Sequence, residues 1–185
     1  QLRELLGEAE LREVLDADVL DEVERDLQLV GGRGARSADS LHDLLLRFGD
    51  LSAVELAERS TDGSGTAWAR ALVDARRAIW LPVAGEPRLV AVEDAARFRD
   101  GLGVPIPPGL PEALLGRDDE ALANLASRYA RTHAPFTLEA LASRFGVAKI
   151  SAERTLRRGA GAGRLLEGEF RPGGTQREWC DAGVL

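Results

Sequence analysis

Arginine side chains near the end of the chain have the type and spacing that neutralise phosphate groups. Arg154, Arg157 and Arg158 lie close together in a run of helix length. At about 100° per residue they fall on one face of a helix. Guanidinium groups gathered on one face suit a row of DNA phosphates, so the pattern predicts a DNA-binding surface. The basic residues that we assign to this surface are Lys149, Arg154, Arg157, Arg158, Arg171 and Arg177.

The opposite face of the same run carries small and apolar side chains, namely Ala152, Leu156, Gly159 and Ala160. A recognition helix would show this division between a basic face and an apolar face. A solvated basic face, with arginines that pair with nearby acids, would show it as well. Ile150 breaks the pattern, because it falls among the arginines. Both interpretations stay open at this point.

A helix followed by a hairpin would position these arginines. The run 159–163 is rich in glycine and ends the helix, and strand-like runs follow at 164–171 and 176–180. Residues 172–175, Pro-Gly-Gly-Thr, are typical of a turn. A helix and then a hairpin with an arginine near each side of its tip indicate a winged helix, a helix-turn-helix variant.

The preceding residues supply the other helices of such a module. The pattern predicts a helix at 119–133, a short extended piece at 135–137 and a helix at 138–145 that Thr137 caps. His133 is expected at the end of the first of these helices. Gly146 would make the turn before the third helix. Trp179, on a strand of the hairpin, is expected in the core, with stacking on a base as the alternative.

Residues 39–102 show the same order of elements. Helices are predicted at 41–48, 53–59 and 66–78, with a short strand at Leu51 and a hairpin of 79–84 and 88–92 that turns at 85–87. Ser52 and Glu55 form a predicted capping box. Arg70 and Arg77 are weaker DNA-binding candidates, because Asp74 lies one helical turn from each and can pair with them.

The run 103–111, Gly-Val-Pro-Ile-Pro-Pro-Gly-Leu-Pro, cannot be helical and separates the two modules. An apolar pattern over 2–30 predicts a leading helix. The predicted division is a helical lead-in and linker at 1–38, a first winged helix at 39–102, a linker at 103–116 and a second winged helix at 117–185. The fold class is mainly α with small β-hairpins (α+β), as tandem winged-helix domains preceded by a helical segment.

Composition places limits on the function. The 185 residues carry a net charge of −7, with 23 arginines but one lysine. Residues 1–30 hold ten acids and three bases, whereas residues 117–185 hold nine acids and eleven bases. The acidic first part repels DNA, and the rest of the chain can still bind a phosphate backbone locally. No apolar run approaches the roughly 20 residues of a membrane helix, and no signal peptide is visible. A single cysteine, Cys180, cannot form an internal disulfide, which fits a reducing cytoplasm. Its side chain is expected to be a small buried hydrophobe.

The sequence lacks the residue patterns of nucleotide binding and of zinc binding. A phosphate-binding Walker loop needs Gly-Lys before Ser or Thr, but the one lysine follows Ala148. Zinc needs several Cys or His ligands at short spacing, whereas His42, His133 and Cys180 are far apart. We therefore assign no catalytic residue and no metal ligand, and we expect no ATPase activity from this chain by itself. Methionine is absent even at position 1, which indicates a segment of a longer protein.

Four runs of the sequence resemble the large helicase-related proteins of bacteria. The most specific is Gly168–Gly174, Gly-Glu-Phe-Arg-Pro-Gly-Gly, with Glu178-Trp-Cys-Asp181 after it. The others are Ala130–Val147, Ala91–Gly103 and Leu41–Leu45. The family consists of long superfamily 2 DNA helicases with winged helices after the motor. The glycine run 159–163 departs from the Leu-rich helix end of that pattern, which leaves the tightness of the packing between helix and wing open.

The resemblance implies an accessory segment of an ATP-dependent DNA helicase involved in DNA repair, in the cytoplasm at the nucleoid. ATP and Mg would bind the motor of the parent chain, and no cofactor is expected in this segment. DNA, the rest of the helicase polypeptide and a second copy of the chain are the implied partners, with no membrane. Two alternatives stay open. One is a winged-helix module for protein interaction or oligomerisation without DNA contact, and the other is a tandem winged-helix domain similar to DNA glycosylases.

Overall fold

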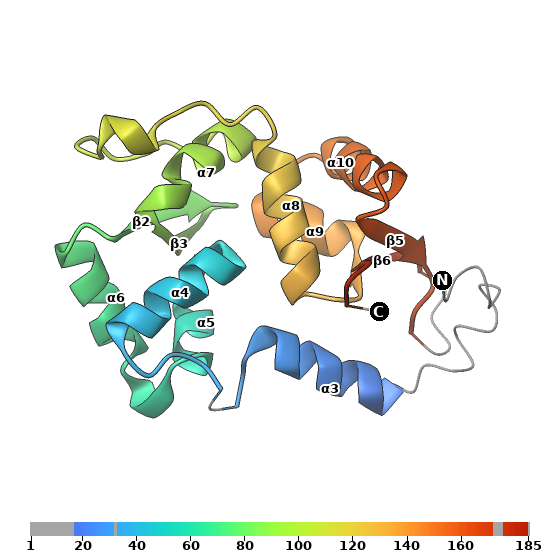
Figure 1. The fold of residues 1–185 in the computed structure, drawn as a ribbon, viewed down its shortest axis with the longest axis horizontal. Helices are drawn as coiled ribbons and strands as arrows, with labels where there is room; N and C mark the ends of the chain where they lie inside the picture. Colours follow the sequence, from blue (N-terminus) through green and yellow to red (C-terminus); the bar gives the residue numbers. More distant parts are fainter. Residues whose placement is uncertain (1–16, 32, 172–175, 185) are drawn as a thin grey trace.

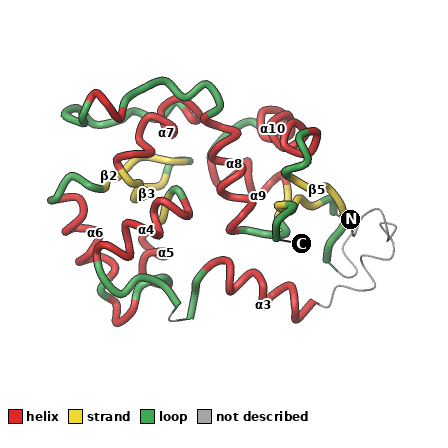
Figure 2. Tube along the Cα trace, in the orientation of Figure 1, coloured by secondary structure: helices red, strands yellow, loops and turns green. Residues whose placement is uncertain are grey.

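The computed structural model describes residues 17–31, 33–171 and 176–184. In these residues short helices surround two small antiparallel sheets of three strands each (Figure 1). Figure 2 shows how little of the chain is strand, and that the strands gather in two separate places. The predicted mainly helical α+β class is confirmed.

The first described helix, α3, spans Ala17–Gln28. The rest of the helix predicted over 2–30 lies outside the described residues. The end of α3 contacts both halves of the molecule. Gln28 Nε2 donates to the carbonyl of Thr132 at 2.7 Å, and Arg47 Nη2 donates to the carbonyl of Leu27 at 3.3 Å. Helix α3 therefore runs alongside both winged helices and is not a separate arm (Figure 1).

The first winged helix consists of α4 (Ala38–Phe48), β1 (Asp50–Leu51), α5 (Ala53–Glu58), α6 (Gly65–Asp74), β2 (Ala78–Val83) and β3 (Glu86–Ala91). The strand order is β1-β3-β2, so β3 pairs with both neighbours. Ser52 begins α5 as predicted. Its hydroxyl accepts from Glu55 N at 3.2 Å, and Glu55 Oε2 accepts from Ser52 N at 2.7 Å. The predicted capping box is confirmed.

Two predicted boundaries in this module are wrong. Helix α6 ends at Asp74 and not at 78, because Arg76 takes a left-handed φ of 57° and the Arg77 N–H donates to the Leu72 carbonyl at 2.8 Å, which closes the helix end. The hairpin turns at Ala84 and Gly85, whose φ angles are 52° and 81°. Two positive φ angles in a two-residue loop match the twist of the strands, so residues 86 and 87 belong to β3.

A helix that the sequence did not predict follows the first sheet. After a 3-10 turn at Val92–Asp94, α7 spans Ala95–Leu102, and Gly103 ends it in a left-handed conformation. The proline segment begins there and holds only the short 3-10 turn Glu112–Leu114. Helix α7 packs against the next helix, since a Cβ on Gly101 would lie 3.0 Å from the backbone N of Leu122.

The second winged helix consists of α8 (Ala121–Thr132), β4 (Phe136–Thr137), α9 (Leu138–Phe145), α10 (Lys149–Gly161), β5 (Leu165–Gly168) and β6 (Glu178–Asp181). Thr137 caps α9 as predicted, with its Oγ1 3.1 Å from Ala140 N. The strand order is β4-β6-β5. The predicted turn 172–175 lies outside the described residues.

The wing strands are shorter than predicted, and a buried carboxylate explains why. The strand β5 ends at Gly168, because the N–H groups of Phe170 and Arg171 donate to Glu178 Oε2 at 3.3 and 3.2 Å instead of joining the ladder. The ring of Phe170 is buried. Cys180 and Trp179 are buried in β6, as the sequence predicts.

The two winged helices share apolar packing. One cluster of buried side chains includes Leu81, Val83, Val90 and Phe98 from the first module and Leu125, Tyr129, Leu141, Phe145 and Trp179 from the second. A second cluster lies within the first module, around Leu41, Leu45 and Leu72. The predicted division into modules stays a prediction, and the structure adds that the core is continuous between them.

Candidate nucleic-acid interface

Helix α10 has one buried face and one basic face. Ala152, Leu156 and Gly159 are buried against the module. Arg154, Arg157 and Arg158 are exposed on the other side, which confirms the predicted division of this helix. The cause is the spacing of the small residues, which recur at three and four along the helix and let it lie close to the sheet.

Three of the predicted basic residues hold exposed acids. Lys149 Nζ lies 2.7 Å from Glu139 Oε1, Arg157 Nη2 lies 2.7 Å from Glu153 Oε1, and Arg158 Nη1 lies 3.4 Å from Glu120 Oε2. The alternative of a face paired with nearby acids is therefore realised at these positions. Ion pairs this exposed contribute about 0–1 kcal/mol to the free energy of folding. A phosphate can displace such an acid at little cost.

Arg154 differs from its neighbours on this face. It is exposed and makes no hydrogen bond or ion pair with the residues that the structure describes. It lies one helical turn after Ile150, so the two side chains are stacked along the helix. Arg154 can therefore bind an anion without first breaking an ion pair.

The two wing arginines have different surroundings. Arg171 pairs with Glu178, donates to the Pro135 carbonyl at 3.2 Å and lies 3.6 Å from Glu24 Oε2 of α3. The contact with Glu24 joins the wing to α3 and was not predicted. Arg177 is 76% exposed, and its Nη1 lies 3.1 Å from Glu167 Oε1. Of the two, Arg177 is the one that points to solvent.

The first module presents less basic surface. Arg70 Nε lies 3.9 Å from Asp74 Oδ2, as predicted, but Arg77 pairs with Asp39 of α4 rather than with Asp74. Its wing tip contacts the second module, because a Cβ on Gly146 would lie 3.0 Å from the Cα of Ala84. The turn of the first hairpin therefore packs on the turn between α9 and α10, where it supports the basic helix.

A buried ionic cluster between the modules was missed by sequence reasoning. Arg144 of α9 reaches into the first module, where its Nη2 lies 3.0 Å from Asp50 Oδ2 and its Nη1 lies 2.5 Å from Glu55 Oε1. It also donates to the Asp50 carbonyl at 2.9 Å. Arg88 of β3 lies 3.0 Å from the same Asp50 oxygen. No local pattern signals these contacts, because the partners are far apart in the sequence.

The charges of this cluster stabilise one another. Burial raises the pKa of Glu55. The hydrogen bond and charge of Arg144 and the Ser52 N–H outweigh this effect and lower the pKa to about 2. Burial lowers the pKa of Arg144, and the charge of Asp50 with the contacts to Glu55 outweighs that effect and raises it. Burial raises the pKa of Asp50, against the lowering effect of the Arg144 and Arg88 charges. Glu55 and Arg144 are therefore ionised at neutral pH, and their contacts with Asp50 form a structural joint between the modules.

His133 lies beside this joint. It follows the last residue of α8, as predicted, and its ring stacks on Tyr129 with the centroids 4.0 Å apart. Nδ1 lies 2.9 Å from Thr132 Oγ1. Burial, together with the charge of Arg144, lowers the pKa of His133 to about 3. The imidazole is therefore neutral at physiological pH and acts as a packing aromatic.

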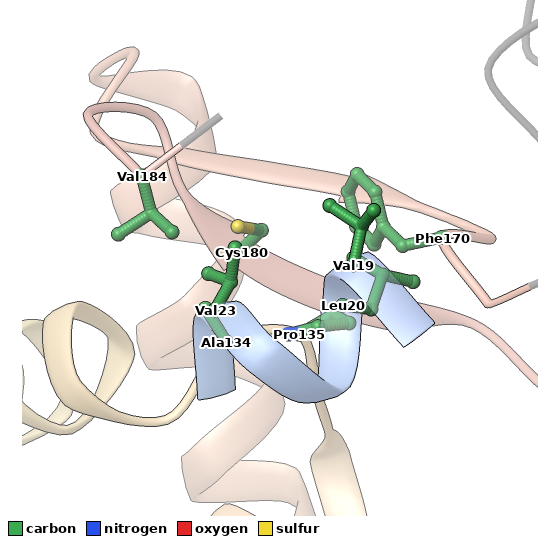
Figure 3. A pocket seen from close by; sticks show the side chains of 8 residues that line it. All are labelled: Val19, Leu20, Val23, Ala134, Pro135, Phe170, Cys180 and Val184. Atoms are coloured by element: carbon green, nitrogen blue, oxygen red, sulfur yellow. The ribbon is translucent and has the colours of Figure 1, made fainter. Parts of the chain in front are cut away.

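A small apolar cavity of about 140 Å³ lies between α3 and the second sheet (Figure 3). Its lining residues are Val19, Leu20, Val23, Ala134, Pro135, Phe170, Cys180 and Val184. Burial raises the pKa of Cys180 to about 12, so its thiol is protonated and not nucleophilic. In the described part of the chain, no group of three His, Cys, Asp or Glu side chains could hold a metal ion. None of the described helices is long and apolar enough to cross a membrane.

Comparison with known proteins gives a consistent result. Residues 13–117 match the winged-helix domain of the large helicase-related protein. Over all 185 residues the chain is 43% identical to the "Lhr helicase/probable uracil glycosylase" of Mycolicibacterium smegmatis, and it covers 12% of that protein. Over 158 residues it is 39% identical to the "Lhr helicase/uracil glycosylase" of Escherichia coli, which corresponds to 84% of the chain and 10% of that protein. The chain thus spans about a tenth of the length of these curated relatives.

Proposed function

The chain belongs to the winged-helix domain family of the large helicase-related protein, and from that premise we propose that it is an accessory DNA-binding segment of a longer ATP-dependent DNA helicase. The second winged helix carries the contact. The motor, with its ATP and Mg, would lie elsewhere in such a protein, and this segment would bind or guide DNA near it. A role of the parent protein in DNA repair is part of the proposal.

The observation that supports the proposal best is the exposed basic face of α10. In a chain of net charge −7, an exposed helix face with three arginines is a local exception. One of them, Arg154, has no partner among the described residues, and the pairs of Arg157 and Arg158 are exposed and weak. Arg177 extends the basic surface onto the wing, with 76% of its side chain exposed.

Binding to labelled duplex DNA, followed by fluorescence anisotropy from about 50 to 200 mM salt, tests this function. Each arginine that neutralises a phosphate adds about 0.9 to the slope of log affinity against log salt. We expect the double variant R157A/R158A to flatten that slope by up to about two units. The matched control is R70A/R77A, which should change it less, because these arginines lie on the first winged helix and the proposed contact lies on the second.

A gain of binding makes the test sharper. The variant E120Q removes the acid that holds Arg158, so it should strengthen binding by a few fold, since an exposed pair is worth less than about 1 kcal/mol. Absence of salt-dependent binding by the unmodified chain would overturn the proposal in favour of a protein-interaction module. Loss in R70A/R77A with an unchanged R157A/R158A would move the contact to the first module.

The glycosylase alternative finds no support in the described residues. Base excision needs a carboxylate that faces a substrate pocket, but the buried acids Asp50, Asp94 and Glu178 each hold arginines. The apolar cavity beside Cys180 is lined by no acid at all. Asp100, Asp118 and Asp119 do line a surface pocket, but each of them pairs with an arginine. We therefore propose a binding segment without excision chemistry. Incubation with a uracil-containing duplex, followed by alkaline cleavage, would contradict this by releasing cut strands.

A further inference from the structure

Ile150 is an apolar side chain in an unusual place. It is 62% exposed, although its residue type is usually buried. It is the second residue of α10 and projects from the basic face and not from the buried one. The other exposed large hydrophobic side chains of the described residues, Val19, Leu46, Val54 and Trp80, lie outside this helix. Nothing in the packing of the second module requires an isoleucine here.

The surroundings of Ile150 indicate what it meets. Arg154 follows it one turn later on the same stripe, and Arg157 and Arg158 continue that stripe. A surface with positive charge beside an apolar side chain attracts a polyanion that has apolar edges of its own. Nucleic acid has this composition, with phosphates outside and bases inside.

The position of a residue along the third helix decides whether it contacts bases or the DNA backbone. In helix-turn-helix folds the first turns of the third helix reach base edges, while later residues and the wing contact the backbone. Ile150 lies in the first turn of α10, and Arg157 and Arg158 lie in its third. A branched apolar side chain in the major groove packs against the 5-methyl group of thymine.

From these observations we propose that Ile150 contacts bases, with the 5-methyl group of thymine in duplex DNA as its partner, while Arg157 and Arg158 contact phosphates. This inference rests on the proposed function and deepens it, because it assigns a residue that reads the base rather than the backbone. Arg154, free of any partner among the described residues, holds the phosphate next to the contacted base.

The test compares two duplexes and two variants. One duplex alternates adenine and thymine, and the other has deoxyuridine in place of every thymidine, which removes only the methyl group. For the unmodified chain we expect the second duplex to bind about fourfold more weakly, the effect of one buried methyl. The variant I150A should bind the thymine duplex roughly tenfold more weakly, keep its salt slope, and show no difference between the duplexes.

Controls separate the failure of this inference from failure of the function. V54A changes an apolar side chain that is 64% exposed on the first module, and it should bind both duplexes as the unmodified chain does. Alkaline cleavage after the measurement checks that the deoxyuridine duplex is intact. Salt-dependent binding that R157A/R158A weakens, with I150A and the deoxyuridine duplex within twofold, would overturn the inference alone. Weaker binding by I150A with no effect of deoxyuridine would overturn the assignment to thymine.

Discussion

At the scale of single residues, the arginines of this chain divide into two groups by burial. Arg144 and Arg88 are about nine-tenths buried and share the carboxylate of Asp50, whereas Arg157 and Arg158 are more than half exposed. The buried contacts of Arg144 cross from the second winged helix to the first and hold the two together, and Arg88 shares their carboxylate from within the first. The exposed pairs leave their guanidinium groups available to an anion, so the same residue type serves two purposes.

The joint gives a prediction about stability. Replacing Arg144 by Met keeps most of the side-chain volume but leaves Asp50 and Glu55 short of a partner. Breaking a buried pair from one side costs about 3–5 kcal/mol, and the remaining Arg88 places the expected loss near the lower limit. Urea unfolding measures it. R157A, which breaks an exposed pair, should lose less than about 1 kcal/mol, and a similar small loss in R144M would show that the joint contributes little.

At the scale of elements, the basic helix depends on a glycine for its packing on the wing. The glycine-rich run 159–163 does not loosen this contact, because Leu165 of β5 is buried directly against Gly159. A Cβ at this position would lie 2.7 Å from Leu165 Cδ1. Gly161 lies in the same helix, and a Cβ there would meet nothing within 4 Å. The two glycines therefore have different reasons to be present.

The pair G159A and G161A tests that packing. Alanine improves helix propensity at both positions by up to about 1 kcal/mol. At 159 the added methyl also overpacks the contact with Leu165, which costs about 1–3 kcal/mol. We expect G159A to be less stable than G161A by about that amount in thermal or urea unfolding. Equal stability of the two variants would mean that β5 moves away from α10 without cost.

At the scale of the whole molecule, the two winged helices are held in one arrangement by contacts from several elements. The first wing tip packs on Gly146, Arg144 enters the first module, and Gln28 of α3 bonds to the end of α8. Arg128 of α8 adds a further pair with the buried Asp94. The basic face of α10 is thus presented by both modules together, because the first one supports the turn that precedes it.

The free energy of unfolding should decrease as the pH falls, because the pKa of His133 is lower in the folded chain than in the unfolded chain. Its folded pKa of about 3 lies below the value near 6.5 of an unfolded chain. As the pH falls below 6.5, the unfolded state takes up the proton first, so stability is complete above 6.5 and decreases toward 3. The slope is at most about 1.4 kcal/mol per pH unit. Urea unfolding at pH values from about 7 to about 5 measures this slope, because the range begins above the unfolded pKa of roughly 6.5 and ends below it.

The variant H133F is the control for this slope. It keeps an aromatic ring against Tyr129 but has no group that titrates, so its stability should change little over the same range. Glu55, with a pKa of about 2, adds its own loss only as the pH falls below its unfolded value near 4.5. An equal slope in H133F and in the unmodified chain would assign the acid sensitivity to other groups.

The sequence alone determined the local features of this protein. The 3.6-residue spacing defined the two faces of α10, Ser52 and Thr137 marked helix starts, and the prolines kept 103–111 free of helix, because each of these effects acts within a few residues. Element ends were less predictable: Arg76 and Ala84 adopt left-handed angles that their residue types do not favour. Only the tertiary structure decided which arginines are free. The partners Glu120, Asp39 and Asp50 come from distant elements, and no spacing along the chain reveals a contact that exists only when helices pack.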